Sequence, residues 1–168
     1  MISEAMQKGL NDQIQCEFHS AYVYLAMVAK FETLALPGCA SWMEKQAREE
    51  AEHAMRLFEH VTDRGGVVTL SQIDAPGAVG ETAIDIFDAA LKHEQYVTKR
   101  IHELFELAQK EGDYPAQTML HWFIDEQVEE VKTATENLDQ FTRAGSNETS
   151  LLMLDQQMAQ RSSTTEPV

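Results

Sequence analysis

The sequence has few positive charges and few cysteines. Its 168 residues contain 28 Asp and Glu against 13 Lys and Arg, which gives a formal net charge of −15. Such a chain repels nucleic acid and anionic membranes and attracts cations, so we expect no nucleic-acid partner. The two cysteines, Cys16 and Cys39, are too few for a disulfide framework or a cysteine-based metal cluster. A reducing compartment is the simpler expectation.

Long apolar runs are also missing. No stretch approaches the roughly 18 apolar residues of a membrane span, and the polar start MISEAMQKGLNDQ contains no apolar signal core. We therefore expect a soluble cytoplasmic protein with no membrane partner. With 43% hydrophobic residues the chain is long enough for one buried core. We expect one domain over residues 1–161 and a polar tail over 162–168.

Glycine and proline are sparse, and they cluster where a helical chain would turn. The stretches between these clusters predict an all-α fold with helices at about 3–33, 38–64, 82–111 and 115–143, and a short fifth helix at about 148–161. Most connections are short, but residues 65–80 form a long one. Sixteen extended residues reach about 50 Å, which exceeds the roughly 40 Å of a 27-residue helix.

The long connection therefore predicts a four-helix bundle with one crossover that runs the length of the bundle, as in ferritin-like bundles. The segment VVTLSQI within it is compatible with a short strand or with none.

Each long helix has an apolar seam at helical spacing, and a carboxylate interrupts every seam near its middle. A residue halfway along a helix stays at mid-height whichever way the helix runs, so these four glutamates should meet in one layer of the core. In the third helix the expected seam is Phe87, Leu91, Glu94, Thr98, Ile101, Phe105 and Ala108. The four interrupting glutamates are Glu17, Glu50, Glu94 and Glu130.

Buried, unpaired carboxylates cost several kcal/mol each, so something must neutralise this layer. The alternatives are glutamates tilted to the flank or paired with Lys or Arg, and protonated acids that share hydrogen bonds. The seams contain no Lys or Arg, however, and two divalent cations would balance four negative charges. Hard oxygen ligands suit iron or manganese.

His53 lies three residues after Glu50, which places two ligand types one turn apart on the same helix face. A symmetric di-iron bundle would repeat this Glu-x-x-His pattern on the fourth helix. Thr133 stands at that position instead, and Gln127 lies one turn before Glu130. We therefore expect two metal positions of unequal affinity.

These residues make the chain similar to bacterial non-haem ferritins along nearly its whole length. The resemblance is carried by Glu17, by EEAEH with Glu50 and His53, by KHEQ with Glu94, and by DEQVEE with Gln127 and Glu130. It implies that Glu17, Glu50 and His53 hold one iron. It also implies that Glu50 bridges, and that Glu94 and Glu130 hold the second iron near Gln127.

The resemblance further implies a third iron position formed by Glu49, Glu126 and Glu129 together with Glu130. By residue pattern alone, the three additional glutamates would be ordinary solvated charges. Haem is not expected, because Ala51 stands where haem-binding relatives have methionine.

The function implied by the resemblance is iron storage with ferroxidase activity in a homo-oligomeric cage of twenty-four subunits. Fe(II) would be oxidised by O2 or H2O2 at an intrasubunit di-iron centre, and the Fe(III) mineral would be stored inside. Two rivals remain open from the sequence. One is a structural or binding helical protein whose acids bind adventitious cations, and the other is a detoxifying oxidase without storage.

Several residues near the seams have two readings each. Tyr24 lies one heptad after Glu17, so it is either a core aromatic or an electron donor to the metals. Trp122 is expected to serve packing before any electron path. Three histidines, His93, His102 and His121, fall off the seams and are read as surface or interface residues.

The short last helix carries apolar residues along one side at Leu151, Leu154 and Met158. A helix of this length is unstable alone and must pack against something. By resemblance it would line a four-fold axis of the cage, with these apolar residues turned outward.

Overall fold

The chain folds into a bundle of four long α-helices with a short fifth helix at one end. The computed structural model describes residues 2–160, and within that range it contains no strand. The all-α fold, the crossover and the fifth helix are confirmed, and the described boundaries lie within two residues of those expected. The expected tail at 162–168 lies outside the described residues. The helices are α1 (Glu4–Thr33), α2 (Pro37–Asp63), α3 (Ala83–Lys110), α4 (Tyr114–Ala144) and α5 (Glu148–Ala159).

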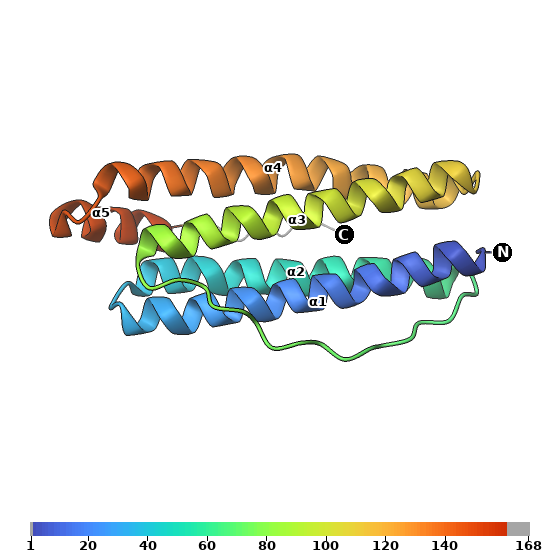
Figure 1. Cartoon of the computed structure of the whole chain (residues 1–168), viewed down its shortest axis with the longest axis horizontal. Coiled ribbons are helices and arrows are strands. Elements are labelled where there is room, and N and C mark those ends of the chain that lie inside the picture. Colours follow the sequence, from blue (N-terminus) through green and yellow to red (C-terminus); the bar gives the residue numbers. More distant parts are fainter. Residues whose placement is uncertain (1, 161–168) are drawn as a thin grey trace.

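Two antiparallel pairs make up the bundle. Helix α1 packs along α2, α3 packs along α4, and contacts between α1 and α3 join the pairs. The crossover runs beside the bundle from the end of α2 back to the start of α3, as Figure 1 shows. This path gives α2 and α3 the same direction, as a bundle with one long crossover requires. All four long helices therefore pass the same mid-height layer.

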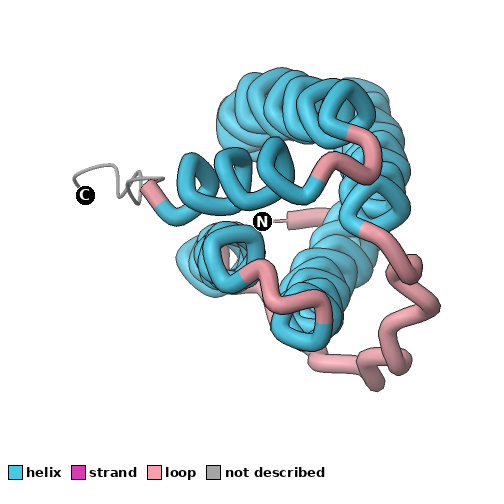
Figure 2. Tube along the Cα trace, turned by 90° about the vertical axis from the view of Figure 1, so that its left-hand side faces the viewer, coloured by secondary structure: helices cyan, strands magenta, loops and turns pink. Residues whose placement is uncertain are grey.

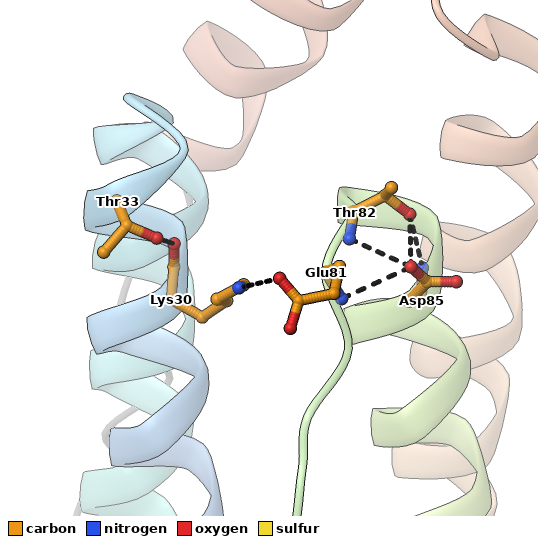
Figure 3. A network of polar contacts seen from close by, with 5 residues as sticks. All are labelled: Lys30, Thr33, Glu81, Thr82 and Asp85. Atoms are coloured by element: carbon orange, nitrogen blue, oxygen red, sulfur yellow. Dashed lines mark hydrogen bonds and ion pairs between the residues drawn. The ribbon is translucent and has the colours of Figure 1, made fainter.

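Local sequence signals explain where the helices begin. The Ser3 hydroxyl accepts a hydrogen bond from the Met6 amide at 3.1 Å, and Asp113 caps α4 in the same way at the Ala116 amide. At the start of α3, Thr82 and Asp85 form a reciprocal capping box, which satisfies two amides that the helix leaves free (Figure 3). These caps fix the register of the helices that carry the mid-height glutamates.

The crossover is held by side chains of α1 rather than by strand pairing. Gln7 accepts a hydrogen bond from the Val67 amide, and four residues later Asn11 bonds the Val67 carbonyl and the Thr69 amide. Farther along, Lys30 pairs with Glu81 just before α3 (Figure 3). Gln7 and Asn11 are spaced one turn apart, so one face of α1 anchors the first part of the connection.

The apolar core is divided into two clusters. One surrounds Phe31, Phe87 and Phe141 near α5, and the other surrounds Leu10, Leu57, Ile101 and Leu120 at the opposite end. Buried polar side chains lie between them on all four long helices. The mid-height layer expected from the interrupted seams is therefore the boundary between the two clusters.

Helix α5 packs against α2 and α4 across one end of the bundle, as the end-on view in Figure 2 shows. Its Asp155 carboxylate accepts a hydrogen bond from the Cys39 amide at 2.8 Å. That amide belongs to the first turn of α2, whose own N-cap residue, Leu36, offers no side-chain cap. The C-terminal helix thus caps α2 from another part of the chain.

The direction of the apolar side of α5 differs from the expectation. Leu151 and Leu154 pack against the core cluster near Phe87, and Met158 is buried with it. The outward-facing apolar residues are Leu152 and Met153, which are 57% and 67% exposed. A short helix gains most by burying its apolar side on its own bundle, which the pattern of spacing alone could not tell from an outward face.

Among the described residues, no helix is both long enough and apolar enough to cross a membrane.

Candidate metal centre

Five polar side chains from the four long helices are almost fully buried at mid-height. Each is at most 6% exposed, in an interior where charged groups are rare unless they are paired. Four come from the expected seams, and His53 lies one turn after the seam residue Glu50. These residues are Glu17 on α1, Glu50 and His53 on α2, Glu94 on α3 and Gln127 on α4.

Glu17, Glu50 and His53 approach one another closely enough to share an ion. Each offers one ligand atom, and these atoms all lie within 4.8 Å of one another. The Nδ1 atom of His53 is 3.8 Å from Oε2 of Glu50, too far for a hydrogen bond. The pair sits one helical turn apart on α2, so both side chains point across the bundle toward α1.

Several ligand atoms in this layer have no hydrogen-bond partner within the chain. They are Oε2 of Glu17, both carboxylate oxygens of Glu50, Oε2 of Glu94 and Nδ1 of His53. An orphaned buried polar atom costs about 1–3 kcal/mol, and more when it is charged. Five such atoms in one layer, four of them oxygens, form a donor set that fits hard divalent cations.

The pKa values of these carboxyl groups also show that ionising them in this layer is unfavourable. Burial raises the pKa of Glu17, of Glu50 and of Glu94 to about 8 each. Neighbouring carboxylates raise them further, with Glu50 acting on Glu17 and Glu94, and Glu130 acting on Glu50. Without a cation, these carboxyl groups therefore hold protons at neutral pH, and a bound cation would replace those protons.

The alternative of pairing with basic side chains does not hold for three of the glutamates. Within residues 2–160, no ion pair joins a Lys or Arg to Glu17, Glu50 or Glu94. Tilting to the flank does not hold either, because all three are at most 1% exposed.

Glu130 is placed at the edge of the layer rather than at its centre. It is half-buried, and its Oε2 accepts a hydrogen bond from Nε2 of Gln46 at 2.7 Å. Gln127, one turn earlier on α4, lies deeper, with its Oε1 2.8 Å from the Thr98 hydroxyl of α3. The α4 side of the layer is therefore more open than the α2 side.

The three glutamates expected at a third position are less buried than the carboxylates of the layer. Glu49 and Glu126 are half-buried, and Glu129 is exposed and lies 3.8 Å from Lys132. Within residues 2–160, the cluster of Glu17, Glu50 and His53 is the group whose ligand atoms meet the distance for holding a metal. A third iron position stays a prediction from the resemblance.

Tyr24 is fully buried, and its hydroxyl donates a hydrogen bond to Oε1 of Glu94. Trp122 is half-buried and meets the His53 ring edge-on at 5.4 Å, with the Arg56 guanidinium 3.9 Å above the indole. Both aromatic residues therefore contact residues of the layer directly, Tyr24 through Glu94 and Trp122 through His53.

The three histidines off the seams differ in their surroundings. His102 and His121 are exposed, as expected. His93 instead lies between α3 and α1, with Nε2 2.8 Å from the hydroxyl of the buried Ser20. Burial, and to a lesser extent His19, lowers the pKa of His93 to about 4, so its ring is neutral at pH 7.

The seam pattern missed several polar residues that contact the layer. Gln13 donates to Oε1 of Glu17 at 2.8 Å, and Gln46 lies next to the layer on α2. A signal for both was present, because each glutamine stands one turn before a seam glutamate on the same helix.

The chain matches known proteins along nearly its whole length. Residues 7–144 match the family described as the ferritin-like domain. A bacterial non-heme ferritin of Staphylococcus haemolyticus is 35% identical over 162 residues, which cover 96% of this chain and 98% of that protein. A bacterial non-heme ferritin of Bacteroides fragilis is 36% identical over 96% of this chain and all of that protein.

The fold has close matches among solved structures. An open pore ferritin from the hyperthermophilic archaeon Archaeoglobus fulgidus superposes with a TM-score of 0.94 at 39% identity, covering 96% of this chain and all of that one. A structure described as a humanized archaeal ferritin superposes equally well at 40% identity. Both matches include the helices that carry the mid-height layer.

Proposed function

The chain belongs to the ferritin family, and from this premise we propose that it is an iron-storage protein with ferroxidase activity. It would bind Fe(II) within each subunit, oxidise it with O2 or H2O2 and keep the Fe(III) product as a mineral inside a cage of twenty-four identical subunits. Iron is the substrate and the cargo. The observation that carries the proposal is the set of unpaired ligand atoms in the mid-height layer.

The hydrogen bonds around the layer suggest a role for each carboxylate. Glu17 and Glu94 each have one oxygen held by a neighbour, by Gln13 and Tyr24 respectively, and one oxygen open. Each is therefore set to bind one ion through a single oxygen. Both oxygens of Glu50 are open, which suits a ligand that bridges two ions.

On this basis Glu17, His53 and Glu50 would hold the first Fe(II), and Glu50, Glu94 and Glu130 would hold the second, near Gln127. The first position combines an imidazole with two buried carboxylates, whereas Glu130 is half-buried and already bonded to Gln46. We therefore expect the first position to bind more tightly than the second.

The chemistry balances with two ions per reaction. Two Fe(II) lose one electron each, and with two protons these electrons reduce O2 to H2O2, or H2O2 to two molecules of water. The carboxylates favour the Fe(III) product because hard, negatively charged oxygens bind the more highly charged ion better. Tyr24, whose hydroxyl donates a hydrogen bond to the ligand Glu94, would add one electron. With one more from a third Fe(II), the total of four electrons and four protons reduces O2 to two molecules of water.

A third iron at Glu49, Glu126, Glu129 and Glu130 is part of the proposal, and haem is not. The proposed compartment is the cytoplasm. Its support is the pair of free, buried thiols of Cys16 and Cys39, which suit a reducing environment.

Stopped-flow absorbance after mixing metal-free protein with Fe(II) and O2 tests the ferroxidase activity. We expect rapid formation of Fe(III) at two ions per subunit, and a loss of at least about 100-fold in rate for Glu50→Ala. Glu52→Ala is the matched control, since Glu52 is exposed on the same helix. Oxidation no faster than in buffer would rule the activity out, and it would favour a helical protein that binds cations adventitiously.

Storage is tested separately from oxidation. Size-exclusion chromatography and electron microscopy should show a hollow shell that acquires an electron-dense core after Fe(II) is added in air. A dimer that oxidises Fe(II) without forming a shell would instead identify a detoxifying oxidase.

A further inference from the structure

Arg100 on α3 reaches across to α1 and ends beside the candidate metal centre without touching a carboxylate of it. Its Nε donates a hydrogen bond to Oε1 of Gln13 at 3.1 Å, and a terminal nitrogen donates to the Asp12 carbonyl at 3.1 Å. The side chain is half-buried, and a guanidinium is always charged in proteins. Arg100 therefore places a fixed positive charge and fixed donors against α1.

This contact determines which way the Gln13 amide faces. Arginine has only donors, so the atom of Gln13 that meets it must be the oxygen. The nitrogen of the same amide must then face the other way, and Nε2 of Gln13 donates to Oε1 of Glu17 at 2.8 Å. Gln13 is 1% exposed, so water does not compete for either bond.

We propose that Arg100 and Gln13 are positioning residues for Glu17, acting as a two-step relay from α3 to the ligand on α1. The inference rests on the proposed function, in which Glu17 binds the first Fe(II). Arg100 orients Gln13, and Gln13 holds Oε1 of Glu17 while Oε2 has no partner. Glu17 can then offer an oxygen to an ion shared with Glu50 and His53. Neither residue touches the metal.

The relay solves a specific problem of the Glu17 side chain. A glutamate has three rotatable side-chain bonds, and ordering such a side chain costs conformational entropy. If that cost were borne at metal binding, the affinity would fall. Partners of metal ligands commonly contribute 10-fold to 100-fold to metal affinity in this way. A rigid donor on Glu17 orders it before the ion arrives.

Calorimetric titration of the metal-free protein with Co²⁺ tests the relay without any turnover. Gln13→Leu removes the donor to Glu17, and Arg100→Met removes the guanidinium while keeping an unbranched apolar side chain. Lys99→Met is the matched control, because it also removes one positive charge from α3 but comes from an exposed side chain. Arg100→Lys tests the conservative change, which keeps the charge and loses the planar fork.

We expect Gln13→Leu and Arg100→Met each to weaken the tighter Co²⁺ site by about 10-fold to 100-fold while the number of sites stays the same. Arg100→Lys should recover only part of this loss, and Lys99→Met should stay within about threefold of the parent protein. The double variant should lose no more than Gln13→Leu alone, because Arg100 acts through Gln13.

Two results would overturn the relay. One is unchanged Co²⁺ affinity in both single variants, and the other is losses that add in the double variant, which would mean that Arg100 acts on the site by charge alone. Circular dichroism checks that the variants fold. If the variant of the buried Gln13 does not fold, the Co²⁺ affinity of Arg100→Met still tests the relay. If the parent protein itself binds no Co²⁺ at this layer, the proposed function fails instead.

Discussion

Three buried carboxyl groups make the stability of the metal-free protein depend on pH in an unusual direction. Burial raises the pKa of Glu17, Glu50 and Glu94 from 4.5 to about 8. Between those values the folded chain keeps protons that the unfolded chain has released. The free energy of unfolding therefore falls as the pH rises from about 5 to about 8. A carboxylate whose pKa is lowered in the folded chain gives the opposite dependence.

Thermal melting of the metal-free protein at pH 6 and pH 8 measures this effect. We expect a lower Tm at pH 8, and a larger increase in Tm from added Co²⁺ at pH 8, because the ion replaces the protons. Glu50→Gln should flatten the dependence on pH, while the exposed Glu52→Gln should leave it unchanged. A Tm that rises from pH 6 to pH 8 would contradict the assignment.

Trp122 should report metal binding directly. Its indole meets the His53 ring edge-on at 5.4 Å, whereas the other tryptophan, Trp42, packs in the core cluster near α5. A transition-metal ion bound to His53 would be close to Trp122 and should quench its fluorescence. We expect Co²⁺ to quench the parent protein and Trp42→Phe, but not Trp122→Phe. Equal quenching of the two variants would place the ion elsewhere.

At the residue scale, the sequence predicted which carboxylates are buried better than it predicted the hydrogen-bond partners of neighbouring polar residues. Glu17, Glu50 and Glu94 stood out because a carboxylate in an apolar seam is costly wherever it packs. The contacts of Gln13 and His93 did not stand out, since a polar residue beside a seam is equally compatible with solvent. Which polar group it meets depends on the neighbouring helix, and a periodic pattern carries no information about that helix.

At the scale of elements, helix α5 depends on a glycine in α2. A Cβ at Gly38 would lie 1.8 Å from the Asp155 carbonyl oxygen, so α5 must shift to admit any side chain there. We expect Gly38→Ala to lower the free energy of unfolding by about 1–3 kcal/mol, the usual cost of overpacking. In Gly38→Ala, the amide hydrogen-exchange rates should rise more in α5 than in the four long helices.

Gly77→Ala is the matched control for this change. Gly77 lies in the crossover, where an added Cβ would meet no atom within 4 Å. The amide hydrogen-exchange rates and the Tm of Gly77→Ala should be close to those of the parent protein. Unchanged exchange in α5 of Gly38→Ala would mean that the two helices separate without cost.

The elements themselves were largely predictable, and their rotation was not. Helix ends follow glycine, proline and capping residues, which act locally, so the boundaries were confirmed within two residues for the described chain. The face of α3 was less well predicted. Leu91 and Phe105 of the expected seam are half-buried, whereas Val97 and Leu104 are buried. Helix α3 packs on both α4 and α1, so its buried face is wider than one seam.

At the scale of the whole molecule, one apolar face is left uncovered. Phe18, Tyr22 and Leu25 follow one another along α1 at helical spacing, and Tyr22 and Leu25 are nearly half exposed. Next to Phe18 the crossover exposes Leu70 at 66%, and Leu70 and Phe18 line a cavity of about 290 Å³. Exposed apolar patches of this kind mark surfaces that bind another protein. In the proposed cage, we expect another subunit to cover this face.

Leu70→Glu tests whether this face holds the cage together. The residue is exposed, so the subunit should still fold and still bind Co²⁺ at its own layer. Buried in an interface, however, the new carboxylate would be costly, and it would add to a chain that already carries a net charge of −15. We expect light scattering to show small oligomers instead of a shell for Leu70→Glu, and a full shell for Gln109→Glu, which adds the same charge at an exposed site on α3.

Rapid oxidation of Fe(II) by Leu70→Glu without retention of the mineral would follow, because the proposed metal layer lies within one subunit and storage needs the closed cage. A shell that forms normally in Leu70→Glu would exclude this face from the contacts between subunits.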